Sequence, residues 1–232
     1  MIYYFETIDS TNKYIKEHVD ELHDFDIVST GFQSSGKGRN DHVWIGKPNQ
    51  NIYTSILIKD KEIIASYSAL SIAVGVIVLR FLSRFVKKDK ISLKWPNDVY
   101  VNGRKICGIL LEGKLPEYIV IGIGININQD IFDIDTATSL SLETSQTYDL
   151  ENIRNEFHSH LLDELKQFIS HKNEYIETFN KHNYLLDKKV SFNYNGQNET
   201  GIARSINSDG SLQVEQDNKV INVFFDEVNT IR

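Results

Sequence analysis

The residues best suited to chemistry lie between positions 94 and 112, which read KWPNDVYVNGRKICGILLE. Two lysines, Lys94 and Lys105, flank the carboxylate of Asp98, and a glycine follows the second lysine. Cations gathered beside a glycine suit a site that binds anions and offers them to a nucleophile, because charged hydrogen bonds to anions are strong. A surface hairpin with solvated lysines is the structural alternative for this stretch.

The same stretch predicts a β-hairpin that brings the two lysines toward one region. Residues 99–101 and 106–111 are mostly β-branched or aliphatic. The pair Asn102-Gly103 between them favours a tight turn, because both residues tolerate positive φ. We interpret Cys107, inside the second strand, as a small core residue rather than an acyl carrier.

A basic loop that reads QSSGKGR follows a strand predicted over 26–32. Gly36 and Gly38 allow backbone to approach a ligand closely, while Lys37 and Arg39 supply positive charge. The spacing matches neither a phosphate-binding P-loop nor a dinucleotide fingerprint. A mobile surface loop is the structural alternative, although Trp44 just beyond it needs something to pack or stack on.

A strand predicted over 118–127 carries two glycines on one face. Gly122 and Gly124 lie two positions apart, and Asn126 continues the same face. Glycine inside a strand marks close approach by a ligand or another backbone. An amide beside a flat glycine floor suits a planar ring.

A third candidate is the start of a helix predicted over 11–22. Asp9 or Ser10 caps this helix, so that Ser10, Thr11 and Asn12 present hydroxyls, an amide and unpaired backbone N–H groups. Such a helix start can hold polar ligand atoms. Capping alone explains the same residues.

Composition narrows the classes of function. The 232 residues can form one large domain with a small second one, and the net charge of -7 argues against general nucleic-acid binding. The single cysteine, the N-terminus without a basic leader, and a longest apolar stretch of only 72–79 predict a cytoplasmic protein that does not enter membranes.

The remaining pattern divides the chain near position 186. A long apolar helix is predicted over 63–86 and an amphipathic helix over 150–170. From position 188 short strands alternate with turns such as Asp209-Gly210, which predicts a small barrel. We therefore expect two domains, 1–186 and 187–232.

Three histidines lie close together in the sequence of the amphipathic helix and just after it. They are His158, His160 and His171, and their spacing matches no familiar metal motif. We expect them to be surface histidines.

Taken in order, these blocks resemble the biotin–protein ligases over almost the whole chain. The KWPND and GIGIN blocks carry the resemblance most specifically. It implies an α/β (α+β) fold, with a class II aminoacyl-tRNA synthetase-like catalytic domain of mixed sheet and packed helices, followed by an SH3-like β-barrel. The chain starts directly at the catalytic domain and looks like a short form without the N-terminal DNA-binding domain of longer relatives.

The resemblance also implies roles for individual residues. Lys105, Arg39 and Asp98 would be catalytic: Lys105 would hold both the biotin carboxylate and the α-phosphate, and Asp98 would lie near the incoming lysine. The biotin-binding residues would be Ser10, Thr11, Asn12, Gln33, Gly36, Lys37, Gly38, Arg39, Lys105 and Gly108. The ATP-binding residues would be Arg39, Trp44, Lys94, Asn97, Lys105, Gly122, Gly124, Asn126 and Arg232.

Two positions depart from the family pattern. Lys37 stands where relatives usually carry arginine, which keeps the charge but loses a planar fork. His42 also stands where relatives usually carry another arginine, so nucleotide affinity is expected to be weaker and to depend in part on histidine protonation.

The resemblance implies an ATP-dependent ligase that uses Mg²⁺, activates biotin as biotinyl-5′-AMP, and transfers it to a lysine of a biotin carboxyl carrier protein domain. Two rivals stay open: a lipoate or octanoate ligase of the same fold, and a catalytically weak biotin-binding relative. The sequence leaves open whether the chain forms a homodimer.

Overall fold

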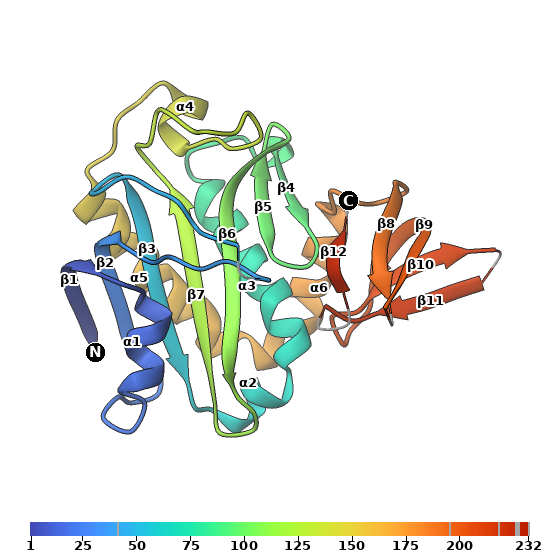
Figure 1. Cartoon of the computed structure of the whole chain (residues 1–232), viewed down its shortest axis with the longest axis horizontal. Coiled ribbons are helices and arrows are strands. Elements are labelled where there is room, and N and C mark those ends of the chain that lie inside the picture. The colour runs from blue at the N-terminus through green and yellow to red at the C-terminus, as the bar shows by residue number, and fades with distance from the viewer. Residues whose placement is uncertain (41, 195, 218, 226–227, 232) are drawn as a thin grey trace.

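A computed structural model describes residues 1–40, 42–194, 196–217, 219–225 and 228–231, the last four as backbone. Its centre is a seven-stranded sheet in the order β1-β2-β3-β7-β6-β5-β4 (Figure 1). β1 and β2 pair in parallel and the other neighbours pair antiparallel, so the sheet is mixed. The strands are β1 Ile2–Ile8, β2 Ile27–Gln33, β3 Asn51–Ile58, β4 Ile91–Lys94, β5 Asp98–Val101, β6 Arg104–Lys114 and β7 Tyr118–Asn126.

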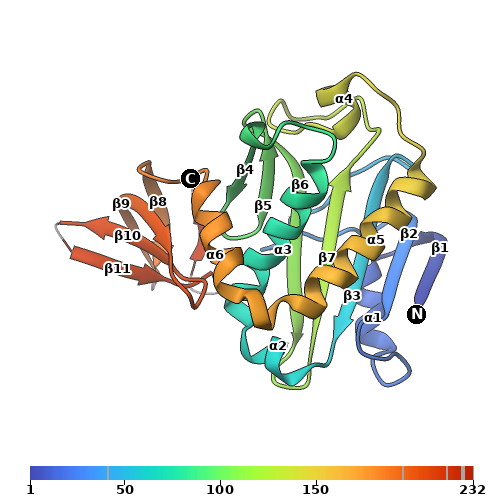
Figure 2. The ribbon, with the colours of Figure 1, turned by 180° about the vertical axis from the view of Figure 1, so that it is seen from behind.

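Helices cover the two faces of this sheet unequally. The short α1 (Thr11–Glu17) lies on one face with a small apolar cluster around Ile15. The larger core lies on the other face, where α3 (Tyr67–Leu82) and α5 (Leu150–Gln167) pack (Figure 2). α6 (Lys172–Lys181) packs against α3, and the 3₁₀ turns Lys88–Lys90 and Ile169–His171 connect elements. One face of the sheet is therefore left largely free for a site.

The helix predicted over 63–86 is divided in two. α2 (Lys61–Ala65) begins where the Asp60 carboxylate accepts from the N–H groups of Glu62 and Ile63, and it ends at Ser66. α3 then begins at Tyr67 and is buried on nearly all sides. α4 (Leu140–Thr144) is a further short helix within a segment without helical periodicity. Among the described residues no helix is long and apolar enough to cross a membrane.

The hairpin predicted from Asn102-Gly103 is confirmed. Asn102 has φ of 48° and Gly103 has φ of 77°, which is the positive-φ pair that a two-residue hairpin turn requires. β5 and β6 pair antiparallel on either side, with Asp98 opposite Gly108 and Tyr100 opposite Lys105.

The chain after α6 forms a second, five-stranded antiparallel sheet in the order β11-β10-β9-β8-β12. A mixed sheet with packed helices followed by a small all-β unit is the α/β class that the sequence predicted, whereas β12 was not foreseen. The Trp95 Nε1–H donates to the Gly210 carbonyl at 3.1 Å, which ties the KWPND block to this unit. The domain boundary at 186 stays a prediction. The strands are β8 Lys189–Tyr194, β9 Gln197–Ile206, β10 Leu212–Gln216, β11 Lys219–Val223 and β12 Val228–Ile231.

The prediction that His158 lies on the surface is wrong. Its side chain is 1% exposed between α5 and β3, and its Nε2 lies 2.8 Å from Thr54 Oγ1. Burial, helped by the nearby charge of Arg154, lowers the pKa of His158 to about 4. His160 is half-buried and His171 is exposed.

The buried His158 predicts acid sensitivity of the fold. The unfolded chain takes up a proton near the ordinary pKa of 6.5, whereas the folded chain resists it down to about pH 4, so stability falls as the pH falls through this window. The loss between about pH 7 and about pH 4.5 is about 2 to 3 kcal/mol. His158→Gln, which keeps a polar group near Thr54, should reduce the pH dependence in denaturant titrations, and His171→Gln should not.

Candidate active site

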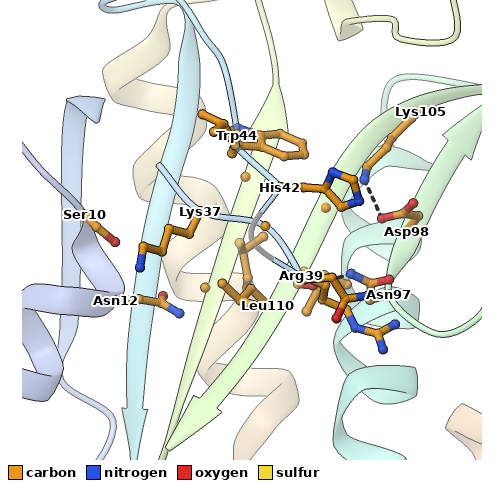
Figure 3. Close-up of a pocket in the computed structure, with 18 of the residues that line it drawn as sticks. Ser10, Asn12, Lys37, Arg39, His42, Trp44, Asn97, Asp98, Lys105 and Leu110 are labelled. Atoms are coloured by element: carbon orange, nitrogen blue, oxygen red, sulfur yellow. Dashed lines mark hydrogen bonds and ion pairs between the residues drawn. The ribbon is translucent and has the colours of Figure 1, made fainter. Parts of the chain in front are cut away.

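A cavity of about 270 Å³ opens on the α1 face of the sheet. The start of α1, the loop after β2, the turn between β4 and β5, and the centres of β6 and β7 enclose it (Figure 3). Most of the predicted site residues line it, although they come from segments far apart in the sequence. They are Ser10, Thr11, Asn12, Gln33, Lys37, Gly38, Arg39, Trp44, Lys94, Asn97, Asp98, Lys105, Gly108, Gly122 and Gly124.

Three predicted residues are not among the described lining residues. Gly36 is buried behind the loop, where its carbonyl accepts from the Trp44 N–H at 3.0 Å. Asn126 is 4% exposed and its Nδ2 donates to the Thr138 carbonyl at 3.0 Å, so a contact with adenine would require this amide to leave Thr138. Arg232 lies outside the described residues.

Hydroxyl and amide groups at the start of α1 form the polar end of the cavity. The Ser10 hydroxyl caps the helix by accepting from the Lys13 N–H. The Thr11 N–H donates to Gln33 Oε1 at 2.9 Å, and Thr11 Oγ1 lies 2.6 Å from Ser55 Oγ. The Ser55 hydroxyl in turn donates to Asn12 Oδ1 at 2.5 Å. The capping predicted from the sequence is confirmed, and the capping residues also line the cavity, whereas their contact with a ligand stays a prediction.

Three glycines form the floor between the two ends. Gly108 of β6 stands opposite Gly124 of β7, and the indole of Trp44 lies over both. A Cβ on either glycine would meet indole carbons at 2.6 Å, and a Cβ on Gly122 would meet the Asn12 amide. The floor therefore needs glycine, as the pattern in β7 predicted, and Trp44 already stacks on it.

Cations gather at the other end of the cavity. Lys105 Nζ forms an ion pair with Asp98 at 2.7 Å and lies 5.4 Å from the centre of the Trp44 ring. Burial lowers the pKa of Lys94; the Asp98 charge opposes this, whereas nearby Lys105 adds to it. Figure 3 shows Lys105 and Asp98 on one side and Lys37 beside Asn12 on the other. An anion entering this region would meet several positive charges balanced in part by one carboxylate.

Asn97 fixes the turn that presents Asp98. Its Nδ2 donates to the Ile109 carbonyl at 2.7 Å, and its own carbonyl accepts from the Ile109 N–H at 2.9 Å. The Ser71 hydroxyl donates to the Pro96 carbonyl at 2.8 Å from the helical side. Asn97 thus holds the turn against β6, while its predicted contact with phosphate stays a prediction.

Arg39 links the basic loop to the second sheet. Its Nη2 donates to the Phe225 carbonyl at 2.6 Å, and the guanidinium lies 5.8 Å from the centre of the Phe225 ring. Phe225 also packs against Tyr67 at the start of α3. The mobile surface loop, given above as the structural alternative, is therefore not what the structure shows, because Arg39 holds this loop against the C-terminal unit.

Three residues in or next to the cavity were not predicted from the sequence: Leu110 and Glu112 of β6, and Ser55 of β3. Leu110 lines it, and Glu112 on the same face of β6 bonds to Asn12 from behind. Strand periodicity could have identified Leu110 and Glu112, because alternate residues of a strand share one face and both follow Gly108 at that spacing. Ser55 gave no comparable signal, since it lies in an apolar run of β3.

Cys107 points away from this chemistry. It is fully buried, and burial raises the pKa of its thiol far above neutrality, which agrees with its interpretation as a core residue. In the described parts of the chain no three His, Cys, Asp or Glu side chains form a group able to hold a metal ion.

Comparisons with known proteins identify the family of this chain. Residues 4–126 match the sequence model of the Biotin/lipoate A/B protein ligase family. The bifunctional ligase/repressor BirA of Escherichia coli (strain K12) is 30% identical over 219 residues, 90% of this chain and 68% of that protein. The biotin--[acetyl-CoA-carboxylase] ligase of Mycobacterium tuberculosis is 29% identical over 215 residues, 89% of this chain and 79% of that protein.

A solved structure shares the whole fold. The biotin protein ligase from Aquifex aeolicus in complex with biotin and ATP matches with a TM-score of 0.87 at 24% identity, over 100% of this chain and 98% of that one. The fold class expected from the sequence is thereby confirmed. The family model and the curated relatives define an enzyme of the ligase class. The chain belongs to the Biotin/lipoate A/B protein ligase family.

The glycine floor predicts how Trp44 responds to an added methyl group. Gly124→Ala should push the indole off the floor, because the new Cβ would lie 2.6 Å from Trp44 Cε2. Collisional quenching of tryptophan fluorescence by acrylamide should then increase, since the other tryptophan, Trp95, is 1% exposed. Gly75→Ala is the control, because its nearest neighbour would be at 3.7 Å. Unchanged quenching in Gly124→Ala would contradict the stacking.

Proposed function

We propose that this chain is an ATP-dependent ligase that activates biotin as biotinyl-5′-AMP and transfers the biotinyl group to a lysine of a biotin carboxyl carrier protein domain. The observation that carries the proposal is the division of one cavity into a neutral polar end and a cationic end, joined by a side-chain-free floor. The Mycobacterium tuberculosis relative is named a biotin ligase and the Aquifex aeolicus structure holds biotin and ATP, which favours biotin over lipoate.

The neutral end suits the ring system of biotin. A cyclic urea offers two N–H donors and one carbonyl acceptor, and Thr11, Asn12 and Gln33 supply hydroxyl and amide partners for them. Ser10 and Gly38 complete this end, and Gly36 supports the loop from behind. The volume of about 270 Å³ lies just below the usual range of small-molecule sites, so the cavity suits biotin as it stands, and ATP would enter only when Trp44 lifts.

The cationic end suits the first chemical step. The biotin carboxylate attacks the α-phosphorus of ATP, a P–O bond to the carboxylate forms, and the bond to pyrophosphate breaks. Both reactants are negative, so their approach requires neutralisation and alignment. Lys105 would bind both anions, with Lys94 and Arg39 lining the same cavity, while Lys37 lines it on the side of Asn12 (Figure 3).

The second step needs a base and exclusion of water. The amine of the carrier lysine attacks the acyl carbon, AMP leaves, and the amine loses a proton. When Lys105 turns to the phosphate, the Asp98 carboxylate, 2.7 Å from it, becomes available to orient that amine or to take the proton. The mixed anhydride hydrolyses in water, so the loop that carries Arg39 would cover it.

The nucleotide would share the glycine floor with Trp44. Adenine and the indole cannot both lie on Gly108 and Gly124, so Trp44 would lift and stack over the adenine when ATP binds. The described residues offer no three-ligand protein cage, so Mg²⁺ would be held chiefly by the nucleotide phosphates, as Mg²⁺ usually is. We assign no step of the reaction to it.

Lys105 gives the first test. Lys105→Ala should lower biotin-dependent pyrophosphate release by about a hundredfold or more, because it removes the group assigned to both anions. Lys114→Ala is the matched control, since Lys114 ends the same strand in an exposed ion pair with Glu117. Near-normal release by a folded Lys105→Ala enzyme would refute the assignment.

Arg39 gives a second test, directed at the loop. Arg39→Gly removes the bond to the Phe225 carbonyl, so the adenylate should escape and label lysines of an added bystander protein at least about tenfold more than wild type does. Streptavidin blotting measures this labelling. Lys47→Gly, whose side chain pairs with Asp130, is the control. Labelling confined to the carrier in Arg39→Gly would show that the loop does not retain the intermediate.

A further inference from the structure

Behind the neutral end of the cavity lies a charged pair that does not line it. Glu112 Oε1 accepts from Lys16 Nζ at 2.8 Å, and its Oε2 accepts from Asn12 Nδ2 at 2.8 Å. Burial tends to raise the pKa of Glu112, but the bonds from Lys16 and Asn12 and the charge of Lys37 outweigh it, so the net pKa is lowered. Glu112 is therefore ionised at neutral pH and can only accept hydrogen bonds.

An acceptor-only group fixes the direction of every bond in the relay that follows. Because Glu112 accepts, Asn12 must turn its NH₂ group toward it and its oxygen toward Ser55. The Ser55 hydroxyl then donates its only proton to Asn12 Oδ1 at 2.5 Å. In the 2.6 Å contact between Ser55 and Thr11 the Thr11 hydroxyl is accordingly the only available donor, and Gln33 Oε1, 3.0 Å from the same hydroxyl, is a second acceptor for its proton.

The other side of Thr11 is fixed as well. Gln33 Oε1 accepts from the Thr11 backbone N–H, a donor whose direction is invariable, so the Gln33 NH₂ group faces away from Thr11. The result is a cavity end in which the orientation of both amides and of the Ser55 hydroxyl is set, and in which the Thr11 hydroxyl donates within the protein, to Ser55 or to Gln33. A cyclic urea, with its carbonyl acceptor and N–H donors in fixed positions, distinguishes one such arrangement from its reverse.

We infer that Glu112 is a positioning residue which, acting through Asn12 and Ser55, sets the proton polarity of the cavity and so makes it selective for a urea ring. The inference rests on the proposed use of biotin. Glu112 touches no ligand itself, and Ser55, which is fully buried, transmits its effect to Thr11.

The test reverses the polarity and changes the ligand to match. In Glu112→Gln the new amide turns its oxygen to the Lys16 ammonium and its NH₂ group to Asn12, which flips the Asn12 amide and reverses the relay. The probes are biotin and 2-iminobiotin, whose protonated guanidinium places a donor where biotin has its carbonyl. Calorimetry measures both dissociation constants for the full-length chain.

We expect wild type to prefer biotin, and Glu112→Gln to shift the ratio of the two dissociation constants toward 2-iminobiotin by at least about tenfold, the effect of one well-placed hydrogen bond. The KM for ATP should stay within about twofold of wild type, since the cationic end is untouched. Ser55→Ala, which cuts the relay at its centre, should shift the ratio in the same direction. Lys13→Met, on the same helix in an exposed pair with Asp9, should leave it unchanged.

The outcomes distinguish a failure of the polarity role of Glu112 from a failure of the proposed function. Equal weakening of both ligands, or an unchanged ratio in folded Glu112→Gln, would overturn the polarity role. If Glu112→Gln does not fold, an unchanged ratio in Ser55→Ala would overturn it instead. A wild-type chain that binds no biotin at all would refute the proposed function itself.

Discussion

The site depends on a patch of sheet that carries no side chains. Gly108 faces Gly124 across β6 and β7, and Gly122 lies on the same face of β7. Sheets usually raise a layer of side chains over every strand, and here that layer is missing at the centre. The gap admits Asn12 from α1 on one side and Trp44 from the loop on the other. The shape of the cavity floor therefore follows from the backbone.

The second constraint is electrostatic. Lysines brought together from separate segments repel one another, and the lowered pKa of Lys94 reflects both its burial and that repulsion. The Asp98 carboxylate offsets part of the cost by pairing with Lys105, and the pair is only partly exposed. An arriving anion can replace Asp98 as the partner of Lys105, which leaves the cations in place and frees a base. Preorganised charge of this kind is the usual source of stabilisation for developing negative charge.

The sequence predicted those parts of the site that depend on local backbone geometry. Asn102-Gly103 set the hairpin, and the spacing of Gly122 and Gly124 placed both on one face, because turn chemistry and strand periodicity are local rules. The sequence did not predict the positions of side chains whose burial and hydrogen bonds depend on distant segments of the chain. His158 reads as an exposed helical residue yet is buried on Thr54, and Asn126 shares the glycine face yet is used by Thr138. Ser66, which divides the long helix, is a break that apolar periodicity does not show.

The C-terminal sheet takes part in this arrangement through two contacts. The Trp95 indole donates to the Gly210 carbonyl at one side of the turn that presents Asp98, and Arg39 bonds to the Phe225 carbonyl. Gly210 approaches the backbone of Ser68 so closely that a Cβ there would meet the Ser68 carbonyl group. The unit is thus held against the start of α3 while it supports both the fixed turn and the basic loop. Because different residues of this unit make the two contacts, a loop movement that breaks the Arg39 bond leaves the Trp95 bond beside Asp98 intact, so Asp98 can keep its position while the loop opens.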